Sequence, residues 1–172
     1  ESDLGERSIY DIVSILLEDV NELEDAKVKG FDYLSGHADG MMPRQIAYLF
    51  TAYHQQHQSM PKIKELLPYL DSFVRTNDST IVKYDTELYY MQAVADLMMQ
   101  NYEASEKSFE RILEEFPGNH QEGNCIYWLG MSRLFLQKYK EGFEPFEDYV
   151  KKFPTGDWVD EALFQGGVCM FG

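Results

Sequence analysis

The sequence is poor in positive charge and in cysteine. Its 172 residues include 15 Lys and Arg against 30 Asp and Glu, which gives a formal net charge of -15 and an isoelectric point near 4.5. Nucleic acids and anionic membrane surfaces bind clustered Lys and Arg, so this composition disfavours unaided binding to either. Two cysteines exclude a disulfide-dense scaffold, although they leave the redox compartment open.

Long apolar runs are also missing from the sequence. No run reaches the roughly 18 residues that a helix needs to cross a bilayer. Hydrophobic residues nevertheless make up 44% and aromatic residues 15% of the chain, which is enough apolar surface to favour a folded domain over disorder. Because the sequence begins at Glu1 instead of Met, a processed or trimmed product is one expectation.

The N-terminal part, residues 1–80, is predicted to be a helical region. Apolar residues recur at helical spacing from Ser8 to Ala26 and predict an amphipathic helix, whose acidic face suits either solvent or a basic partner. The glycines between Gly30 and Gly40 then predict a short helix followed by a loop.

Two further helices are predicted before residue 80. Pro43 suits the first turn of a helix that ends near Gln58, and Ser59 starts a second helix in which Pro68 predicts a kink. This second helix is expected to bury Ile63, Leu66, Leu67, Leu70, Phe73 and Val74. The pair is interpreted as a degenerate repeat or cap, the alternative being that these helices fold back across a groove formed by later repeats.

The second half of the chain repeats itself at an interval of 37 residues. The matched positions are Tyr90 and Tyr127, Ala93 and Gly130, Leu97 and Leu134, Gln100 and Gln137, Tyr102 and Tyr139, Phe109 and Phe146, and Phe116-Pro117 and Phe153-Pro154. Gly167 and Phe164 extend two of these series. Each unit is interpreted as a helical hairpin, in which the small residue permits close approach, the Phe fills the space between helices and the Pro ends the second helix.

These residues resemble the tetratricopeptide repeat family. Trp128-Leu129-Gly130, Tyr139, Gly142 with Phe146, and Pro154 are similar to its signature. The 37-residue repeat length resembles that of the family's bacterial cell-envelope subset. This subset includes proteins of the outer-membrane assembly lipoprotein type and of the Tol-Pal coordinator type. The resemblance implies an all-α fold of antiparallel hairpins stacked as a right-handed superhelix, with repeats at 86–119 and 123–156 and an incomplete third from 160, within a repeat region of 81–172.

The sequence departs from the family pattern at three places. The usual early Trp is displaced to Trp128, and the usual Tyr after the small residue is Asp96 or Arg133. Pro145 lies inside a predicted second helix, where a distorted turn or a kink is expected. These departures weaken any inference of ideal superhelical geometry.

In this family the first helices line a concave surface, which the resemblance makes the candidate partner-binding groove. The residues that it places there are Tyr90, Val94, Leu97, Tyr127, Met131, Leu134, Phe164 and Val168. They are apolar or aromatic, so the chain does not resemble members that clamp a C-terminal carboxylate with Lys, Asn and Arg. These eight groove residues have three possible interpretations. They form hydrophobic core, they form a site filled by the chain's own helix of residues 8–26, or they form a site for an amphipathic partner helix.

Candidates for chemistry are few in the sequence. His54 and His57, three residues apart and preceded by His37 and Asp39, are weak metal candidates. Cys125 and Cys169 lack a metal or redox spacing and are interpreted as small buried hydrophobic residues. No phosphate-binding loop or nucleophile motif is present, so neither an enzyme nor a cofactor is predicted.

The sequence thus predicts a non-catalytic scaffold or adaptor that binds a protein or peptide, with an amphipathic or basic segment as the expected partner. An assembly or regulatory domain of a larger envelope complex or enzyme is the alternative, and a metal-binding protein is a weaker one. Phe164, Val168 and Phe171 are expected to be uncovered, as in a fragment of a longer repeat protein or a homodimer. The resemblance favours a periplasmic or cell-envelope location, with the cytoplasm as the alternative.

Overall fold

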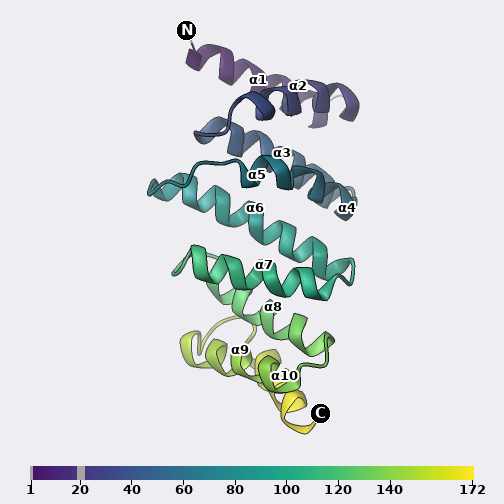
Figure 1. The fold of residues 1–172 in the computed structure, drawn as a ribbon, viewed down its shortest axis with the longest axis vertical. Helices are drawn as coiled ribbons and strands as arrows, with labels where there is room; N and C mark the ends of the chain where they lie inside the picture. Colours follow the sequence, from purple (N-terminus) through teal and green to yellow (C-terminus); the bar gives the residue numbers. More distant parts are fainter. Residues whose placement is uncertain (1, 19–21) are drawn as a thin grey trace. The chain divides into compact units, whose positions relative to one another are not determined.

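A computed structural model describes residues 2–18 and 22–172, and the described part of the chain is helical without strands. Within each part of the chain, helices that are neighbours in sequence form the hairpins (Figure 1). The predicted all-α class of TPR-like hairpins is therefore confirmed. The chain divides into two compact units, residues 1–88 and 89–172, with the boundary inside one helix.

The first unit begins with α1 (Ser2–Glu18) and α2 (Leu23–Gly36), which pack against each other and against α3 (Met41–Gln56). The single helix predicted from Ser8 to Ala26 is wrong, because α1 ends at Glu18 and α2 begins at Leu23. Splitting the segment lets Val13 and Ala26 both become fully buried, one on each helix of a hairpin.

The expected interruption at Pro68 is present. The second helix of the next hairpin consists of α4 (Met60–Ile63), a 3₁₀ turn η1 (Lys64–Leu66) and α5 (Leu67–Asp71). Proline offers no N–H to the carbonyl four residues before it, which lies in the 3₁₀ turn. Ile63, Leu66, Leu70 and Phe73 are buried as expected, but the burial predicted for Val74 is wrong. Val74 is 53% exposed because the helix has already ended and its backbone bonds to the loop at Ala38.

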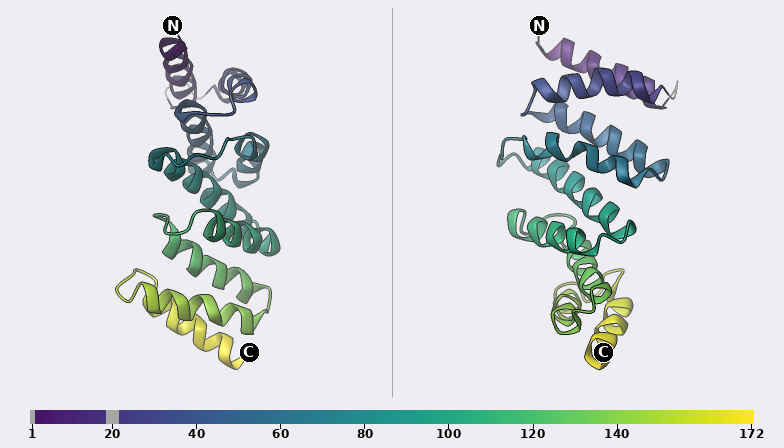
Figure 2. Two further views of the ribbon diagram at one scale, coloured as in Figure 1. Left: turned by 60° about the vertical axis from the view of Figure 1, so that its left-hand side comes forward. Right: turned by 45° about the vertical axis from the view of Figure 1, so that its right-hand side comes forward.

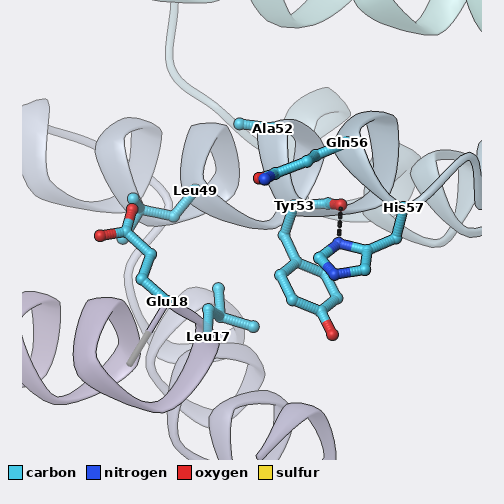
Figure 3. A pocket seen from close by; sticks show the side chains of 7 residues that line it. All are labelled: Leu17, Glu18, Leu49, Ala52, Tyr53, Gln56 and His57. Carbon is cyan, nitrogen blue, oxygen red and sulfur yellow. Dashed lines mark hydrogen bonds between the residues drawn. The ribbon is translucent and has the colours of Figure 1, made fainter. Parts of the chain in front are cut away.

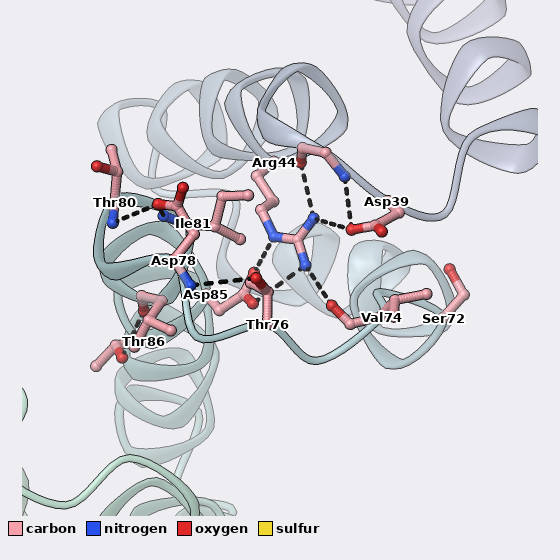
Figure 4. Close-up of polar contacts among 12 residues, drawn as sticks. Asp39, Arg44, Ser72, Val74, Thr76, Asp78, Thr80, Ile81, Asp85 and Thr86 are labelled. Atoms are coloured by element: carbon pink, nitrogen blue, oxygen red, sulfur yellow. Dashed lines mark hydrogen bonds and ion pairs between the residues drawn. The ribbon is translucent and has the colours of Figure 1, made fainter.

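A buried arginine joins the loops of the first unit (Figure 4). Arg44, with a fully buried side chain on α3, donates through Nε to Oδ1 of Asp85 at 2.7 Å. Its other nitrogens donate to the carbonyl oxygens of Gly40 at 2.7 Å and Val74 at 3.0 Å, and its guanidinium lies 4.5 Å from the centre of the Phe73 ring. One side chain thus fixes two loops and a later helix.

That later helix is α6 (Ser79–Met98), which starts earlier than the repeat predicted from residue 86. Asp78 accepts hydrogen bonds from the backbone N–H groups of Thr80 and Ile81 (Figure 4). A side-chain acceptor at this position satisfies N–H groups that have no partner within the helix.

The second unit begins inside α6, after Leu88. Its further helices are α7 (Tyr102–Glu115), α8 (Glu122–Phe135), α9 (Tyr139–Lys152) and α10 (Val159–Phe171). Figure 2 shows them from two sides. Phe109 of α7 lies 6.2 Å from Tyr90 of α6, and Phe146 of α9 lies 5.9 Å from Tyr127 of α8, measured between ring centres. The repeated Phe therefore fills the same place in both hairpins, as the sequence predicts.

Gly130 shows why the repeat has a small residue on its first helix. A Cβ atom added to Gly130 would lie 2.8 Å from the Phe146 ring, so only glycine permits this helix separation. On the second helices, Ser105 takes the corresponding small position and donates to the carbonyl of Ala93 at 3.1 Å. The small residue on the first helix and the Phe on the second helix therefore contact each other directly, and each is needed for the close approach of the two helices.

Pro145 lies inside α9, yet the helix remains α-helical from Tyr139 to Lys152. Its missing N–H would have paired with the carbonyl of Glu141. Arg133 of α8 donates to that carbonyl through Nη1 at 3.0 Å and thereby satisfies it. An irregularity in one helix is compensated by a side chain from the helix before it.

Three hairpin turns share a backbone conformation that is unusual for their residues. Gln58, Gln100 and Gln137 are the non-glycine residues with positive φ in the described chain, at 55°, 62° and 58°. In each turn the following N–H bonds to the carbonyl five residues earlier, as for Ser59 to His54, which is the Schellman pattern. The sequence matched only Gln100 and Gln137, whereas the turn at Gln58 favours the degenerate-repeat interpretation of α3 to α5.

Candidate protein-binding surface

The eight residues predicted for the groove lie on α6, α8 and α10 of the second unit, but they differ in exposure. Leu97 and Tyr127 are buried, at 9% and 3%. Tyr90, Val94, Met131 and Leu134 are half-buried. Phe164 and Val168 are exposed at 65% and 38%. Six of the eight residues are therefore at least partly accessible to a partner. They are Tyr90, Val94, Met131 and Leu134, which are half-buried, and Phe164 and Val168 on α10, which are exposed.

Tyr127 is held in the core by aromatic packing. Its ring stacks on Trp158 at 4.7 Å with an interplanar angle of 9°, and it contacts Tyr149 and Phe146 edge-on. Trp158 is fixed in turn by donating from Nε1 to Oδ1 of Asn124 at 2.8 Å. Burial raises the pKa of the Tyr127 hydroxyl to about 12. Tyr127 is therefore a core residue that packs beneath the candidate groove and is not itself accessible to a partner.

Two exposed apolar residues on the same helices were missed by the sequence reasoning. Met98 at the end of α6 is 64% exposed and Phe135 at the end of α8 is 46% exposed. They are 37 residues apart, so the repeat interval itself was the signal that could have found them. The Phe135 ring stacks on Tyr102 at 4.9 Å, which holds it in a defined orientation. These side chains extend the accessible apolar row defined by Val94 and Met131.

A charged cluster joins the second helix of one repeat to the next repeat. Glu106 of α7 accepts from Arg133 at 3.1 Å and from Lys138 at 2.5 Å, and Arg133 also donates to Glu110 at 2.7 Å. Burial opposes ionisation of Glu106, but the hydrogen bonds from Lys138 and Arg133 outweigh it and lower the pKa of the carboxyl. The cluster therefore holds adjacent repeats together as ions at neutral pH.

The first unit has a pocket of its own between α1 and α3, with a volume of about 450 Å³. Figure 3 shows Leu17 and Glu18 from α1 facing side chains of α3. The α3 residues that line it, with the residue that follows the helix, are Leu49, Ala52, Tyr53, Gln56 and His57. His57 stacks on Tyr53 at 4.1 Å and donates from Nδ1 to the Tyr53 carbonyl at 2.9 Å. The pocket is mixed in polarity and lies on first helices, as the predicted groove does.

His54 and His57 do not form a metal site together. His54 is 1% exposed, whereas His57 points to the exposed side of the helix, where it stacks on Tyr53. Among the described residues no group of three or more His, Cys, Asp or Glu side chains is placed to hold a metal ion. Within the same residues neither ring nitrogen of His54 has a hydrogen-bond partner. Burial, followed by the nearby Lys27 charge, lowers the pKa of His54, so the ring is neutral at pH 7.

Cys125 and Cys169 are not joined in a disulfide, and both are buried. Burial raises the pKa of Cys169, which lowers the fraction of reactive thiolate. Both therefore behave as the small hydrophobic residues that the sequence predicts, and neither adds a reactive group to the surface.

Comparison with known proteins agrees with the repeat geometry. Residues 87–119 and 124–156 match the family model described as the tetratricopeptide repeat. The match supports the interpretation of these two segments as tetratricopeptide repeats, and they coincide with the α6–α7 and α8–α9 hairpins. No curated protein matches the chain. No described helix combines the length and apolar character that crossing a membrane requires.

Proposed function

We propose that this protein is a non-catalytic scaffold that binds a polypeptide segment on the first-helix surface of its second unit. Tetratricopeptide repeats generally bind protein partners and typically act without catalysis. The observation that carries the proposal is the row of accessible apolar side chains repeated at one register, Val94 and Met131 with Met98 and Phe135. Hydrophobic side chains exposed in a regular series suit contact with an extended or helical peptide.

The remaining predicted groove residues have supporting roles in this proposal. Tyr90 and Leu134 flank the accessible row, Leu97 and Tyr127 support it from beneath, and Phe164 and Val168 continue it on α10. Methionine is flexible and polarizable, so Met98 and Met131 suit partners of variable shape. Met131 is half-buried and packs against the core that contains Tyr127 and Phe146, so we expect its substitution to weaken binding and to destabilise the fold less than substitution of Tyr127 does.

The net charge of -15 favours a basic partner segment, and the apolar row favours an amphipathic one. Long-range attraction between opposite charges raises the association rate and is screened by salt. We therefore expect association to slow as ionic strength rises. A rate that does not depend on salt would instead assign recognition to the apolar row alone.

Site-specific photo-crosslinking tests the proposal. A photoreactive phenylalanine analogue replaces Met131 in the intact chain, and a matched control places it at the exposed Lys107 of α7. We expect the Met131 probe to capture a defined protein whose purified form binds the unmodified chain and loses affinity for Met131→Glu. Equal capture by both probes, or unchanged affinity of Met131→Glu, would contradict the proposed surface.

The finer assignments rest on the resemblance in sequence to the cell-envelope subset. We propose a periplasmic or cell-envelope location, in which the chain serves as an assembly or regulatory domain of a larger complex, with the cytoplasm as the alternative. Fractionation of the native source with antibody detection distinguishes these locations. A homodimer through the C-terminal helix is tested by sedimentation equilibrium of the intact chain, in which a monomer mass across the concentration range would contradict it. A metal function through His54 and His57 is disfavoured by their opposite exposures.

A further inference from the structure

The chain has two tryptophans, Trp128 on α8 and Trp158 directly before α10, and they lie together. Their ring centres are 5.4 Å apart, and the indole planes are inclined by 64°. Trp128 also meets Tyr127 edge-on at 4.9 Å, whereas Trp158 uses one ring face to stack on Tyr127. Both tryptophans are half-buried. Packing against the core therefore leaves part of each indole accessible.

Hydrogen bonds hold this tryptophan pair in place. Trp158 donates from Nε1 to Oδ1 of Asn124 at 2.8 Å and from its backbone N–H to the Tyr149 hydroxyl at 3.1 Å. Asn124 is held in turn, because its Nδ2 donates to Oε1 of Gln121 at 2.6 Å. These bonds use the indole edge and the backbone, so they do not occupy the ring faces. Side chains that are fixed in advance lose little freedom when a ligand binds.

The charge beside the pair is negative. Glu161, in the first turn of α10, is exposed and accepts from the uncharged Nε2 of Gln165 at 2.7 Å. Burial and, after it, the charge of Glu161 raise the pKa of the Tyr127 hydroxyl to about 12, so this carboxylate acts on the ring cluster. The helix that carries Glu161 has no Lys or Arg. Two further exposed acidic residues border Trp158, namely Asp157 and Asp160.

Two accessible indoles beside a carboxylate fit a cationic side chain. Trp attracts cations more strongly than the other aromatic side chains, within about 6 Å of the ring centre. Because the two ring centres are 5.4 Å apart, one cation can lie within this range of both. A planar guanidinium also stacks on aromatic faces, which favours arginine over lysine. The chain makes such contacts internally, since Arg44 lies 4.5 Å from the ring centre of Phe73 and Arg111 lies 4.7 Å from that of Tyr89.

The tryptophan pair is accessible although helices lie on both sides of α8. That helix packs against α7 and α9 and also contacts α10, yet Trp128 is half-buried. Gln121, 37 residues before Trp158, is half-buried as well, although α9 and α10 follow it. A residue at this register therefore stays partly accessible when a further hairpin follows it.

We infer that Trp128 and Trp158 form a binding site for an arginine side chain of the partner segment, with Glu161 supplying the opposite charge. The inference rests on the proposed function, because it names a residue type in the segment that the second unit binds. Trp128 lies three residues before Met131 on α8, so their side chains share a helix face. An arginine of the segment contacts the tryptophan pair while an apolar neighbour contacts Met131.

A tri-arginine peptide with blocked ends is the probe for this site. Its control is tri-citrulline, because citrulline keeps the planar shape of arginine without the charge. Both tryptophans of the intact chain lie at the site, so their fluorescence reports binding directly. We expect a saturable change with tri-arginine and about tenfold weaker affinity for tri-citrulline. No change with tri-arginine, or equal affinity for the two peptides, would overturn the inference.

Variants of the chain separate the site from its overall charge. Glu161→Gln should weaken tri-arginine by about threefold, whereas Glu144→Gln, at an exposed glutamate of α9, removes the same charge and should bind as the parent does. Trp128→Leu keeps an apolar side chain and should weaken the peptide by about fivefold, measured by calorimetry. Equal losses in the two glutamate variants, or unchanged affinity of a folded Trp128→Leu, would refute the arginine site.

The peptide titration and the crosslinking at Met131 fail independently. Tri-arginine needs no natural partner, so its binding is measured whether or not the Met131 probe captures a protein. Capture at Met131 without tri-arginine binding would leave the proposed function standing and remove the arginine site. Tri-arginine binding without capture would contradict the proposed function and leave the arginine site established.

Discussion

The two units use the same hairpin turn but hold their helices together in different ways. In the second unit an apolar contact between a glycine and a Phe closes the α8–α9 hairpin, as at Gly130 and Phe146. In the first unit the fully buried Arg44 joins two loops and α6 through ionic and backbone hydrogen bonds. The turns at Gln58, Gln100 and Gln137 are nevertheless alike.

This difference shows that hairpin geometry does not require one kind of core. The apolar contact depends on shape, and a small change in volume is enough to disturb it. The buried ion cluster depends on complete pairing, since each charge that loses its partner remains in a poorly solvated place. The following variants test whether the two units respond as these mechanisms require.

The largest effect is expected from Arg44→Met. The variant leaves the Asp85 carboxylate, 4% exposed, without its ion-pair partner and removes the donor to the Val74 carbonyl. Removing one partner of a buried pair costs about 3–5 kcal/mol. Urea unfolding followed by far-ultraviolet circular dichroism measures the loss.

Two controls accompany Arg44→Met. Arg111→Met removes a partly exposed arginine of the second unit that pairs with Glu115 and lies over the Tyr89 ring, and it should cost about 1 kcal/mol. Arg44→Met combined with Asp85→Leu should recover part of the loss, because no buried charge is left alone. If Arg44→Met and Arg111→Met lose equal stability, the ionic account of the first unit is wrong.

Gly130→Ala and Gly167→Ala are a matched pair for the apolar contact. The new methyl group at Gly130 would clash with Phe146 and cost about 1–3 kcal/mol. At Gly167 it meets nothing within the described chain, and the better helix propensity of Ala should stabilise by up to about 1 kcal/mol. Both tryptophans lie in this unit, so their fluorescence during urea unfolding reports each change. Equal shifts in the same direction would refute the proposed role of Gly130.

Arg133→Met should destabilise the second unit by about 1 kcal/mol. The variant removes the donor to the Glu141 carbonyl and the ion pairs with Glu106 and Glu110. Pro145→Ala restores an N–H that can pair with the same carbonyl. The double variant should therefore lose less stability than the two single changes predict, as a double-mutant cycle measures. Strict additivity would show that Arg133 does not compensate for Pro145.

The smallest expected effect concerns pH and His54. Burial lowers the pKa of His54 below its ordinary value of 6.5, so the unfolded chain takes up the proton first as pH falls. Its contribution to stability is present above about pH 6.5 and is lost progressively as pH falls through the folded-state pKa. His54→Leu should reduce the difference in melting temperature between pH 7.5 and pH 5, whereas the exposed His57→Gln should not. The same difference in both variants would contradict this assignment.

Several features of the fold were predictable because they depend on local sequence. The Phe109 and Phe146 positions, the glycine at 130 and the interruption near Pro68 follow from periodicity, side-chain volume and the missing proline N–H. The break between α1 and α2 was missed because the apolar spacing continues across it. The Arg44 cluster was missed because its partners lie 30 and 41 residues away in sequence.

The candidate surface was predictable only in part. The repeat interval places Tyr127, Met131 and Phe164 on corresponding first helices, but it says nothing about what covers each of them. Trp158 and α9 bury Tyr127, while the same face of α10 leaves Phe164 exposed. Exposure depends on neighbours that come from other helices.

The sequence by itself therefore determined the repeat, its small and aromatic positions and the acidic character of the chain, because these are properties of residue type and spacing. Tertiary structure alone decided that Arg44 is buried and paired, that Arg133 satisfies the carbonyl that Pro145 leaves without a donor, and that the Phe146 ring packs directly against Gly130. The physical reason is that burial, pairing and steric fit arise between helices, and an isolated pattern on one helix does not specify what packs against it.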